Sequence, residues 1–271
     1  MGDVLGFVVI WVILSLLAEW GLSVVKPHSL YDVIASQGFL AERAFNFLAT
    51  WLTPVFVFVV VYLIYVLIRF HAPNGKPERS RAQFLRNKGF VAVWVGFSFL
   101  VNILFWLHPT SADLEQMFSS DMPSRNHGDL VVDVTARQWE WIFSYPQYKV
   151  TQAVNHLGED ELELPVGRKV EFVLRSYDPF HTYDVYAGVI HDFWIPAFGT
   201  KEAVVPGITR YEYIRPTVLA SYQTNPMVRV QCAEVCGPGH PWMEAPVSIV
   251  TAKHFATWIK HQQKLQAQAG G

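Results

Sequence analysis

The chain has 271 residues, a formal net charge of −2 and a hydrophobic content of 51%. This length allows one or two domains, and without a basic stripe the charge gives no reason to expect nucleic acid as a partner. The apolar residues are concentrated before residue 110, and the rest of the sequence contains no apolar run of membrane-spanning length. We therefore expect a membrane-embedded first part and a water-exposed second part.

Three stretches are apolar enough to cross a bilayer, at about residues 5–25, 48–68 and 89–107. A helix needs about 20 mostly apolar residues to span a ~30 Å hydrocarbon core. We therefore predict a transmembrane region over residues 1–110, with the last two spans forming a hairpin. The first stretch lacks a preceding positive charge and a small-residue cleavage site, so we interpret it as a retained helix and not as a signal peptide.

The loop between the second and third spans predicts the orientation. It contains one acid, Glu78, and five basic residues: Lys76, Arg79, Arg81, Arg86 and Lys88. Short loops rich in Lys and Arg stay in the cytoplasm. We therefore expect a multi-pass protein of a bacterial-type plasma membrane, with its C-terminal part on the outer side. Glu19, near the outer end of the first span, is expected to reach toward the interface; a carboxylate that faces a partner subunit is the alternative.

The second part of the sequence changes to short strands separated by turns. Residues 111–128 are predicted as a polar linker, and residues 129–252 alternate between apolar and polar positions at several places. Turn signals recur at Gly158, Gly167, Gly207 and Gly237. This pattern favours an antiparallel β-sandwich. Residues 253–271 are predicted as a terminal helix with a tail, so the expected fold class is an α+β membrane protein.

The two cysteines lie in one short segment, at Cys232 and Cys236, followed by His240 and Met243. In a domain outside the cytoplasm a disulfide is the simplest alternative, but it leaves the His and the Met unexplained. A zinc site is a second alternative, although a thioether suits copper better than zinc. Two thiolates on one tight loop can bridge two copper ions, and each ion then needs its own imidazole. We expect the second imidazole from His191, with His181 as its rival.

The spacing Cys-x-Glu-x-Cys-x-x-x-His-x-x-Met resembles the CuA loop of cytochrome c oxidase subunit II. Two other segments, and the helical hairpin before a soluble domain, are also similar to that family. The segments are the aromatic run from Gln138 to Trp141 and the run from His191 to Pro196, with Gly199, Lys201, Pro206 and Gly207 after it. The resemblance covers about residues 45–255.

The resemblance implies a cupredoxin-like β-sandwich or barrel over residues 129–252, which binds a binuclear copper (CuA) centre. In it Cys232 and Cys236 bridge both ions, while His191 and His240 each ligate one. Met243 is implied as an axial ligand, and Glu234 as a ligand through its backbone carbonyl oxygen. The side chain of Glu234 is implied to reach a magnesium ion at the subunit border. Trp139 is implied as the point at which the electron enters.

The resemblance also implies the function and the partners. Electrons would pass from cytochrome c, or a similar donor, through the copper to subunit I of a heme-copper oxidase, where O2 is reduced to water with proton translocation. A subunit of a nitric-oxide reductase-type enzyme is the alternative. Because no site on this chain would carry the oxygen chemistry, other oxidase subunits are expected as partners. Three acids near Trp139 would steer a basic donor: Glu140, Asp192 and Glu244.

Three features depart from the family pattern. Residues 179–188 form an insertion just before His191, which we interpret as a longer loop; an altered docking surface for the donor is the alternative. Many members carry a Glu three residues before a Trp in the last span, whereas here Val91 precedes Trp94. The first span is also not general to the family.

Overall fold

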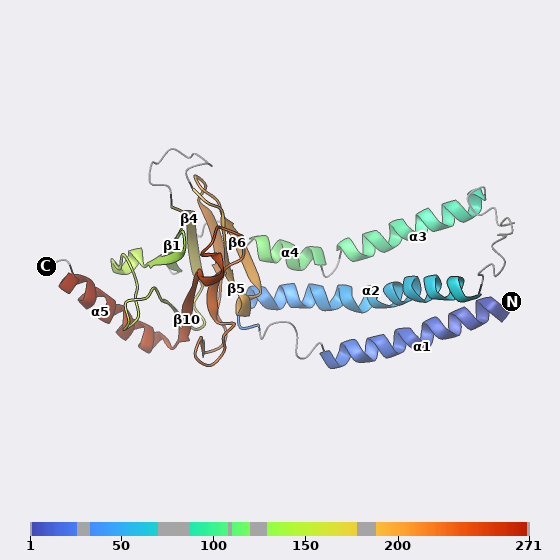
Figure 1. Cartoon of the computed structure of the whole chain (residues 1–271), viewed down its shortest axis with the longest axis horizontal. Helices are drawn as coiled ribbons and strands as arrows, with labels where there is room; N and C mark the ends of the chain where they lie inside the picture. Colours follow the sequence, from blue (N-terminus) through green and yellow to red (C-terminus); the bar gives the residue numbers. More distant parts are fainter. Residues whose placement is uncertain are drawn as a thin grey trace. The chain divides into compact units, whose positions relative to one another are not determined.

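The computed structural model describes residues 2–25, 33–69, 87–107, 110–119, 129–177 and 188–269 (Figure 1). The chain divides into two compact units, one formed by Met1–Ser29 and Arg43–Leu114 and the other by Leu30–Glu42 and Glu115–Gly271. The basic loop predicted to be cytoplasmic lies outside the described residues, apart from Lys88. His181 and almost all of the 179–188 insertion also lie outside them.

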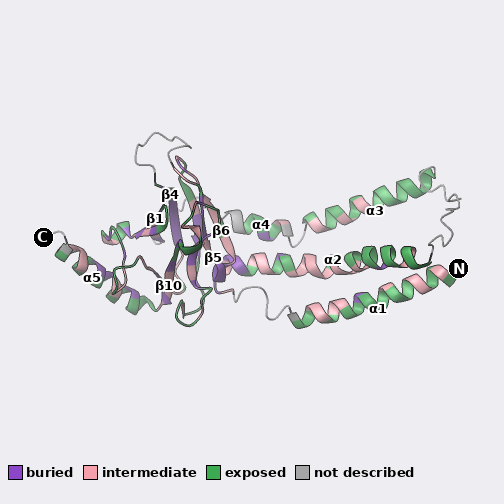
Figure 2. Cartoon of the chain, in the orientation of Figure 1, coloured by how far each residue is buried: buried purple, intermediate pink, exposed green. Residues whose placement is uncertain are grey.

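Three long apolar helices precede the β-structure, as the sequence predicts. They are α1 (Gly2–Val25), α2 (Ser36–Arg69) and α3 (Lys88–Leu107), and each is long and apolar enough to cross a membrane. Most of their large apolar side chains are exposed in the isolated chain, and little of their surface is buried in Figure 2. Apolar surface on this scale calls for lipid or other apolar helices around it.

Helices α1 and α2 pack side by side. The Phe7 ring lies edge-on to Phe58, with 5.3 Å between the ring centroids. Trp11 Nε1 donates to the carbonyl oxygen of Pro54 at 2.8 Å, and Asp3 pairs with Arg69 at 2.8 Å. Because the residue number falls along α2 as it rises along α1, the two helices run antiparallel.

A fourth helix, α4 (Thr110–Ser119), occupies part of the segment predicted as a linker. Its buried Asp113 forms a two-pronged ion pair with Arg43 of α2. Asp113 also lies in the first turn of α4, where a negative charge is favoured by the helix dipole. Residues 111–119 of the predicted linker are therefore helical, because a tertiary ion pair supports a helix that the polar composition does not indicate.

The second unit consists of two β-sheets. One sheet has the order β2-β1-β4-β7, and the other has the order β3-β10-β9-β5-β6 with β8 beside β10. The strands of the first sheet are β1 (Leu130–Arg137), β2 (Glu140–Ser144), β4 (Val170–Ser176) and β7 (Arg210–Ile214). Those of the second are β3 (Leu162–Pro165), β5 (His191–Ile195), β6 (Thr200–Val204), β8 (Ala220–Ser221), β9 (Arg229–Cys232) and β10 (Glu244–Val250).

Both sheets contain one parallel pair, β1 with β4 and β3 with β10. The predicted β-sandwich is confirmed, but its strands are not all antiparallel as the pattern favoured. Alternation of apolar and polar residues reports which face of a strand is buried, but it carries no information on strand direction. A parallel pair needs a long connection between its strands. Here β2 and β3 lie between β1 and β4 in the chain.

The core lies between the sheets, with alternate residues of β1 buried. Aromatic rings continue the core toward the start of β5: the Phe193 ring lies 5.0 Å from Phe172 and 5.6 Å from Trp141, centroid to centroid. This aromatic layer supports the end of the domain at which β9 ends and β5 begins. The rigid framework for a site at that end is thus a packed core and not a loop.

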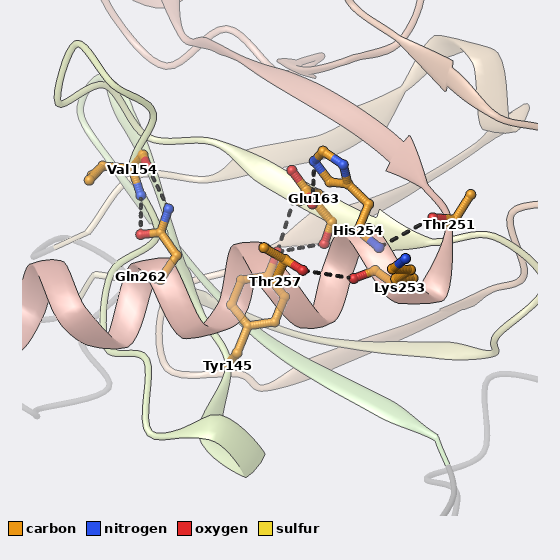
Figure 3. Close-up of polar contacts among 8 residues, drawn as sticks. All are labelled: Tyr145, Val154, Glu163, Thr251, Lys253, His254, Thr257 and Gln262. Carbon is orange, nitrogen blue, oxygen red and sulfur yellow. Dashed lines mark hydrogen bonds and ion pairs between the residues drawn. The ribbon is translucent and has the colours of Figure 1, made fainter.

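The chain ends in helix α5 (Ala252–Ala269), where the sequence predicts a helix. Its apolar face covers the edge of the domain near β3, with Trp258 5.3 Å from the Tyr145 ring. Gln262 of α5 donates to the carbonyl oxygen of Val154 at 2.7 Å and accepts from its N–H (Figure 3). Two short 3-10 helices lie in connections between strands: η3 (Pro146–Tyr148) follows β2, and η4 (Pro196–Phe198) lies between β5 and β6.

Candidate metal centre

Strands β5 and β9 and the loop after β9 bring the predicted metal ligands together. His191 is the first residue of β5, and Cys232 is the last residue of β9. The two strands are antiparallel neighbours, with Phe193 opposite Cys232. The pairing of two strands thus places an imidazole beside a thiol that is 41 residues away in the chain.

The loop after β9 folds back on itself through its own backbone. Cys232 N–H donates to the carbonyl oxygen of Met243 at 3.0 Å, which closes the loop. Inside it, Gly237 adopts a φ of 118°, a conformation that side chains with a Cβ rarely take. The short helix η5 (His240–Trp242) follows, so that His240 and Met243 turn toward the two cysteines.

The side-chain donor atoms form a continuous series of short contacts. Cys232 Sγ lies 3.8 Å from His191 Nδ1 and 3.8 Å from Cys236 Sγ. Cys236 Sγ in turn lies 3.6 Å from His240 Nδ1 and 3.8 Å from Met243 Sδ. Two ligands that each stand about 2.0–2.3 Å from one tetrahedral metal ion are separated by roughly 3.5 Å. The spacing therefore fits neighbouring ligands of shared metal ions.

Burial keeps this cluster out of water. His191, Cys232, Cys236 and Met243 are all at most 2% exposed, whereas His240 is half-buried. Burial, followed by the nearby His240, lowers the pKa of His191 to about 4, so its imidazole is neutral at pH 7. Burial, followed by the charge of Cys232, raises the pKa of Cys236 to about 12. A metal ion that binds here must therefore displace the thiol proton, as thiolate ligation requires.

The geometry disfavours the disulfide alternative. Both cysteines are free, and their sulfur atoms are 3.8 Å apart, well beyond the ~2.05 Å of an S–S bond. His191, Cys232 and Cys236 offer donor atoms that lie within 4.8 Å of one another, a grouping that can hold a metal ion. The buried thioether of Met243 beside them is a soft ligand, which favours copper over zinc.

The backbone and the side chain of Glu234 lie in different surroundings. Its carbonyl oxygen lies 3.1 Å from Cys232 Sγ, on the inner side of the loop. Its side chain is exposed. The structure therefore places a backbone oxygen, and not the carboxylate, among the predicted ligands.

Two adjacent side chains hold the loop from outside. Gln138 Nε2 and Trp139 Nε1 both donate to the carbonyl oxygen of Cys236, at 2.7 and 3.1 Å. The Trp139 ring is 40% exposed and lies against Gly239, where an added Cβ would come within 2.2 Å of it. We did not predict a role for Gln138; its place directly before Trp139 was the available signal.

Trp141, two residues on, points the other way. It is 1% exposed, lies 6.1 Å from the His191 ring centroid, and donates from Nε1 to the carbonyl oxygen of Met243 at 3.3 Å. The turn explains the contrast: residues two apart in an extended strand would share a face, but Trp139 lies in the turn before β2 and does not follow the alternation of the strand. Trp141 is therefore a core residue and Trp139 a surface residue.

The three acids predicted to steer a basic donor are all in ion pairs. Glu140 pairs with Arg137 at 3.0 Å, and Glu244 with Arg229 at 3.0 Å. Asp192 is only 7% exposed and accepts a hydrogen bond from Lys201 at 2.8 Å. Each of the three acids therefore has a basic neighbour, and charge steering of a donor at these positions stays a prediction. Charge counting along the sequence cannot detect pairing between strands.

Comparison with known proteins places residues 130–251 in the family described as cytochrome C oxidase subunit II, periplasmic domain. The alternative cytochrome c oxidase subunit 2 of Bradyrhizobium diazoefficiens is 25% identical over 245 residues, which cover 81% of this chain and 79% of the relative. Cytochrome c oxidase subunit 2 of Thermostichus vulcanus is 34% identical over 137 residues, 51% of this chain and 35% of the relative. The crystal structure of the periplasmic domain of subunit II of a Bradyrhizobium japonicum cytochrome oxidase is 24% identical, with a TM-score of 0.41, and covers 52% of this chain and 98% of that one.

Two sheets form a cupredoxin-like domain with a buried thiol–imidazole cluster at one end that can hold a metal ion, and three helices long and apolar enough to cross a membrane precede it. The family match covers the sheets and the whole ligand loop. The domain of residues 130–251 belongs to the family described as cytochrome C oxidase subunit II, periplasmic domain, so the resemblance noted in the sequence is confirmed for this part of the chain.

Proposed function

We propose that this chain is the electron-accepting subunit of a terminal respiratory oxidase. It takes electrons from cytochrome c, or a similar small donor, at a binuclear copper centre and passes them to a heme-copper catalytic subunit. There O2 is reduced to water, with coupled proton translocation. The observation that supports this most is the continuous donor series from His191 through both cysteines to His240, with Met243 beside it. Ligands drawn entirely from the protein leave no position for a substrate, which suits electron transfer.

The donor set fits two copper ions better than one. Both sulfurs lie between the two imidazoles, so Cys232 and Cys236 would bridge, His191 would serve one ion and His240 the other. Met243 and the Glu234 carbonyl oxygen would be additional weak ligands. Thiolate, imidazole and thioether are the ligands that copper prefers. When bound, the copper pair supplies a reversible one-electron redox step.

The residues around the donors hold them still and keep water out. Trp141 packs beside His191 and binds the backbone of Met243, so it restrains two ligands at once. Lys201 and Asp192 join β6 to β5 directly after His191. Second-shell contacts of this kind orient ligands and tune a metal centre. A rigid site is suited to electron transfer because little has to rearrange when the charge changes.

Trp139 is the proposed point at which the electron enters. Its ring is exposed to an approaching donor, while its indole N–H contacts the backbone of Cys236. Surface and ligand are thus joined by one hydrogen bond. Because the nearby acids are paired, we propose that the donor is recognised mainly by shape and apolar contact around this ring, with Trp242 and Val235 also exposed on the ligand loop.

The proposed setting is a plasma membrane, with the three apolar helices inserted beside subunit I and other oxidase subunits. The metal-binding domain would lie on the outer side. The exposed carboxylate of Glu234 is proposed to face a magnesium ion at the border with the catalytic subunit. This arrangement would leave the carbonyl oxygen of Glu234 facing the cysteine side of the loop.

Metal analysis of the purified full chain tests the proposal. We expect two copper ions per chain and a purple, mixed-valence absorption spectrum, both abolished by Cys232→Ser. Met227→Leu is a matched control for Met243→Leu, because Met227 is exposed and outside the donor series. The control should keep the spectrum, whereas Met243→Leu should alter it. A single copper per chain, or zinc alone, would contradict the proposal.

A further inference from the structure

A cavity of about 340 Å³ lies between the first two turns of α2 and one end of the β4–β7 strand pair. Among the described residues, its lining contains two basic side chains, one leucine and no acid: Ser36, Gln37, Leu40, Gln116, Lys169 and Arg215. All six belong to the unit that carries the sheets, and none is a proposed metal ligand. The volume is within the range of pockets for small ligands.

Backbone hydrogen bonds hold the two sides of this cavity together. Ser36 N–H donates to the carbonyl oxygen of Arg215 at 3.1 Å. Thr217 N–H donates to the carbonyl oxygen of Ile34 at 2.8 Å. The segment that leads into α2 is therefore fixed against the segment that follows β7, and the cavity is part of the folded unit.

The two basic residues of the cavity are neighbours at one end of the sheet. Val170, the first residue of β4, is opposite Ile214, the last residue of β7. Lys169 directly precedes β4, and Arg215 directly follows β7. The strand register therefore brings two like charges together, an arrangement that is unfavourable without a negative partner.

Lys169 and Arg215 differ in the partners that they have. Lys169 Nζ lies 3.8 Å from Asp129 Oδ2 and 4.5 Å from the centroid of the Tyr213 ring, so its charge is partly balanced. Arg215 is exposed, and its hydrogen bonds to other described residues come from its backbone. The guanidinium group of Arg215 is therefore left for a ligand of the cavity.

Gln37 is the buried polar residue of the cavity, at 9% exposed. Its Oε1 accepts hydrogen bonds from Ser36 Oγ at 2.7 Å and from the backbone N–H of Arg215 at 3.1 Å. A backbone N–H can only donate, so the atom that it contacts is the amide oxygen, and this fixes the orientation of the amide group. The amide nitrogen, which carries two hydrogens, has no partner among the described residues. An acceptor inside the cavity would satisfy it.

The available donors favour an anion with several oxygen atoms. An Arg guanidinium group binds phosphate through two parallel N–H groups, and a Lys ammonium group adds a point charge. The first turn of α2 contains no acidic residue, so the positive end of its helix dipole is not balanced there. A tetrahedral oxyanion presents acceptors in several directions at once and can therefore meet Gln37 and both basic side chains.

The length of α2 indicates where such an anion comes from. Gln37 precedes Leu48, the start of the predicted span, by eleven residues, or roughly 16 Å along a helix axis. The headgroup layer extends only about 5–8 Å beyond the hydrocarbon core on each side. A phosphate group dissolved in water therefore fits this position better than the phosphate of a lipid.

We propose that this cavity binds one phosphate group of a water-soluble anion. Arg215, Lys169 and the amide nitrogen of Gln37 are its donors. The bound anion joins the first turn of α2 to the β4–β7 strand pair. The choice of a soluble source depends on the membrane insertion of α2 proposed above, whereas the site itself depends on neither insertion nor copper.

Calorimetric titration of the full chain with inorganic phosphate tests the site. Micelles of a sugar-based detergent contain no phosphate, and constant ionic strength keeps general charge screening unchanged. We expect one phosphate per chain. Arg215→Gln should weaken binding at least about tenfold, because a charged donor is lost. Arg210→Gln is the matched control, since Arg210 is at the other end of β7 and pairs with Glu202.

Gln37→Glu is a second variant that keeps the shape of the side chain. Its carboxylate can still accept from Ser36 and from the backbone of Arg215, so the variant should fold and keep its copper. It loses the amide donors and adds a negative charge, so phosphate binding should disappear. Wild-type affinity in Gln37→Glu would overturn the proposal. Equal weakening in Arg215→Gln and Arg210→Gln would also overturn it, because the effect would then be one of net charge alone.

A second arm of the experiment distinguishes a lipid from a soluble anion. Phosphatidylglycerol is added to the same micelles, and native mass spectrometry counts the lipids that stay bound. We expect the same number in the wild type and in Gln37→Glu. Lipid lost from Gln37→Glu would overturn the soluble source, and failure to bind inorganic phosphate would overturn the site. A copper-free chain would contradict the proposed function and leave both arms unaffected.

Discussion

Trp139 and Cys236 are joined by a hydrogen bond of 3.1 Å from the indole N–H of this partly exposed ring to the backbone carbonyl oxygen of a proposed copper ligand. Gln138 donates to the same oxygen at 2.7 Å, so this carbonyl group is held from two sides. The surface of the domain is therefore connected to the buried cluster through a single peptide group.

Trp139→Phe removes this connection while keeping an aromatic ring. We expect slower electron uptake from reduced cytochrome c in stopped-flow experiments. Copper content should be retained, because one lost hydrogen bond costs only about 0.5–1.5 kcal/mol. Trp242→Phe is the matched control, since Trp242 is 76% exposed on the same loop. Equal slowing in both variants would contradict a specific role for Trp139.

Gly239 provides the space that the Trp139 ring occupies. In Gly239→Ala the new Cβ would come within 2.2 Å of Cδ2 of the ring, so the ring must move. We expect a destabilisation of about 1–3 kcal/mol, typical of overpacking, measured by thermal unfolding of the metal-free protein. The double variant with Trp139→Ala is the control: there the Gly239→Ala change should cost little, and an unchanged cost would refute the ring clash as the cause.

His191 is the proposed second imidazole ligand, and His181 is the alternative. Replacing each of them in turn shows which one binds copper. His191→Ala should lose the mixed-valence spectrum, because one copper ion would have no imidazole. His181→Ala should keep the spectrum, and so should a change at the exposed His156. Loss of the spectrum in His181→Ala would show that the wrong histidine has been assigned.

Glu163, which lies outside the metal centre, should make the stability of the domain depend on pH. It is 4% exposed, and burial followed by the charge of Glu161 raises its pKa from 4.5 to about 8. Its carboxyl group lies 3.8 Å from His254 Nε2 of α5, and its backbone groups bond the hydroxyl of Tyr145 (Figure 3). Between about pH 4.5 and 8 the folded state therefore binds more protons than the unfolded state at this residue.

The free energy of unfolding should consequently fall as the pH rises from about 4.5 to about 8. In Glu163→Gln this fall should largely disappear, which urea denaturation of the metal-free protein at pH 5 and pH 8.5 can measure. The effect is limited to a few kcal/mol, because one pKa unit corresponds to about 1.4 kcal/mol. Glu159→Gln, at an exposed position, should retain the wild-type slope. A Glu163→Gln variant with the wild-type slope would assign the dependence to another group.

The sequence by itself determined the features that depend on neighbouring residues. The three apolar helices follow from length and composition, and the four proposed side-chain ligands of the loop between Cys232 and Met243 follow from spacing over twelve residues. The terminal helix also appears where its pattern predicts it. In each case the interactions are local, so a pattern along the chain is sufficient.

Only the tertiary structure decided which distant groups meet. The pairing of β5 with β9 brings His191 to Cys232, and the turn before β2 brings Gln138 and Trp139 to Cys236. The same holds for the ion pairs of Asp192 with Lys201 and of Glu244 with Arg229. The parallel strand pairs and the helix supported by Arg43 were likewise not predicted. These contacts are set by strand direction and packing between segments far apart in sequence, and periodicity along one segment contains no information about its partner.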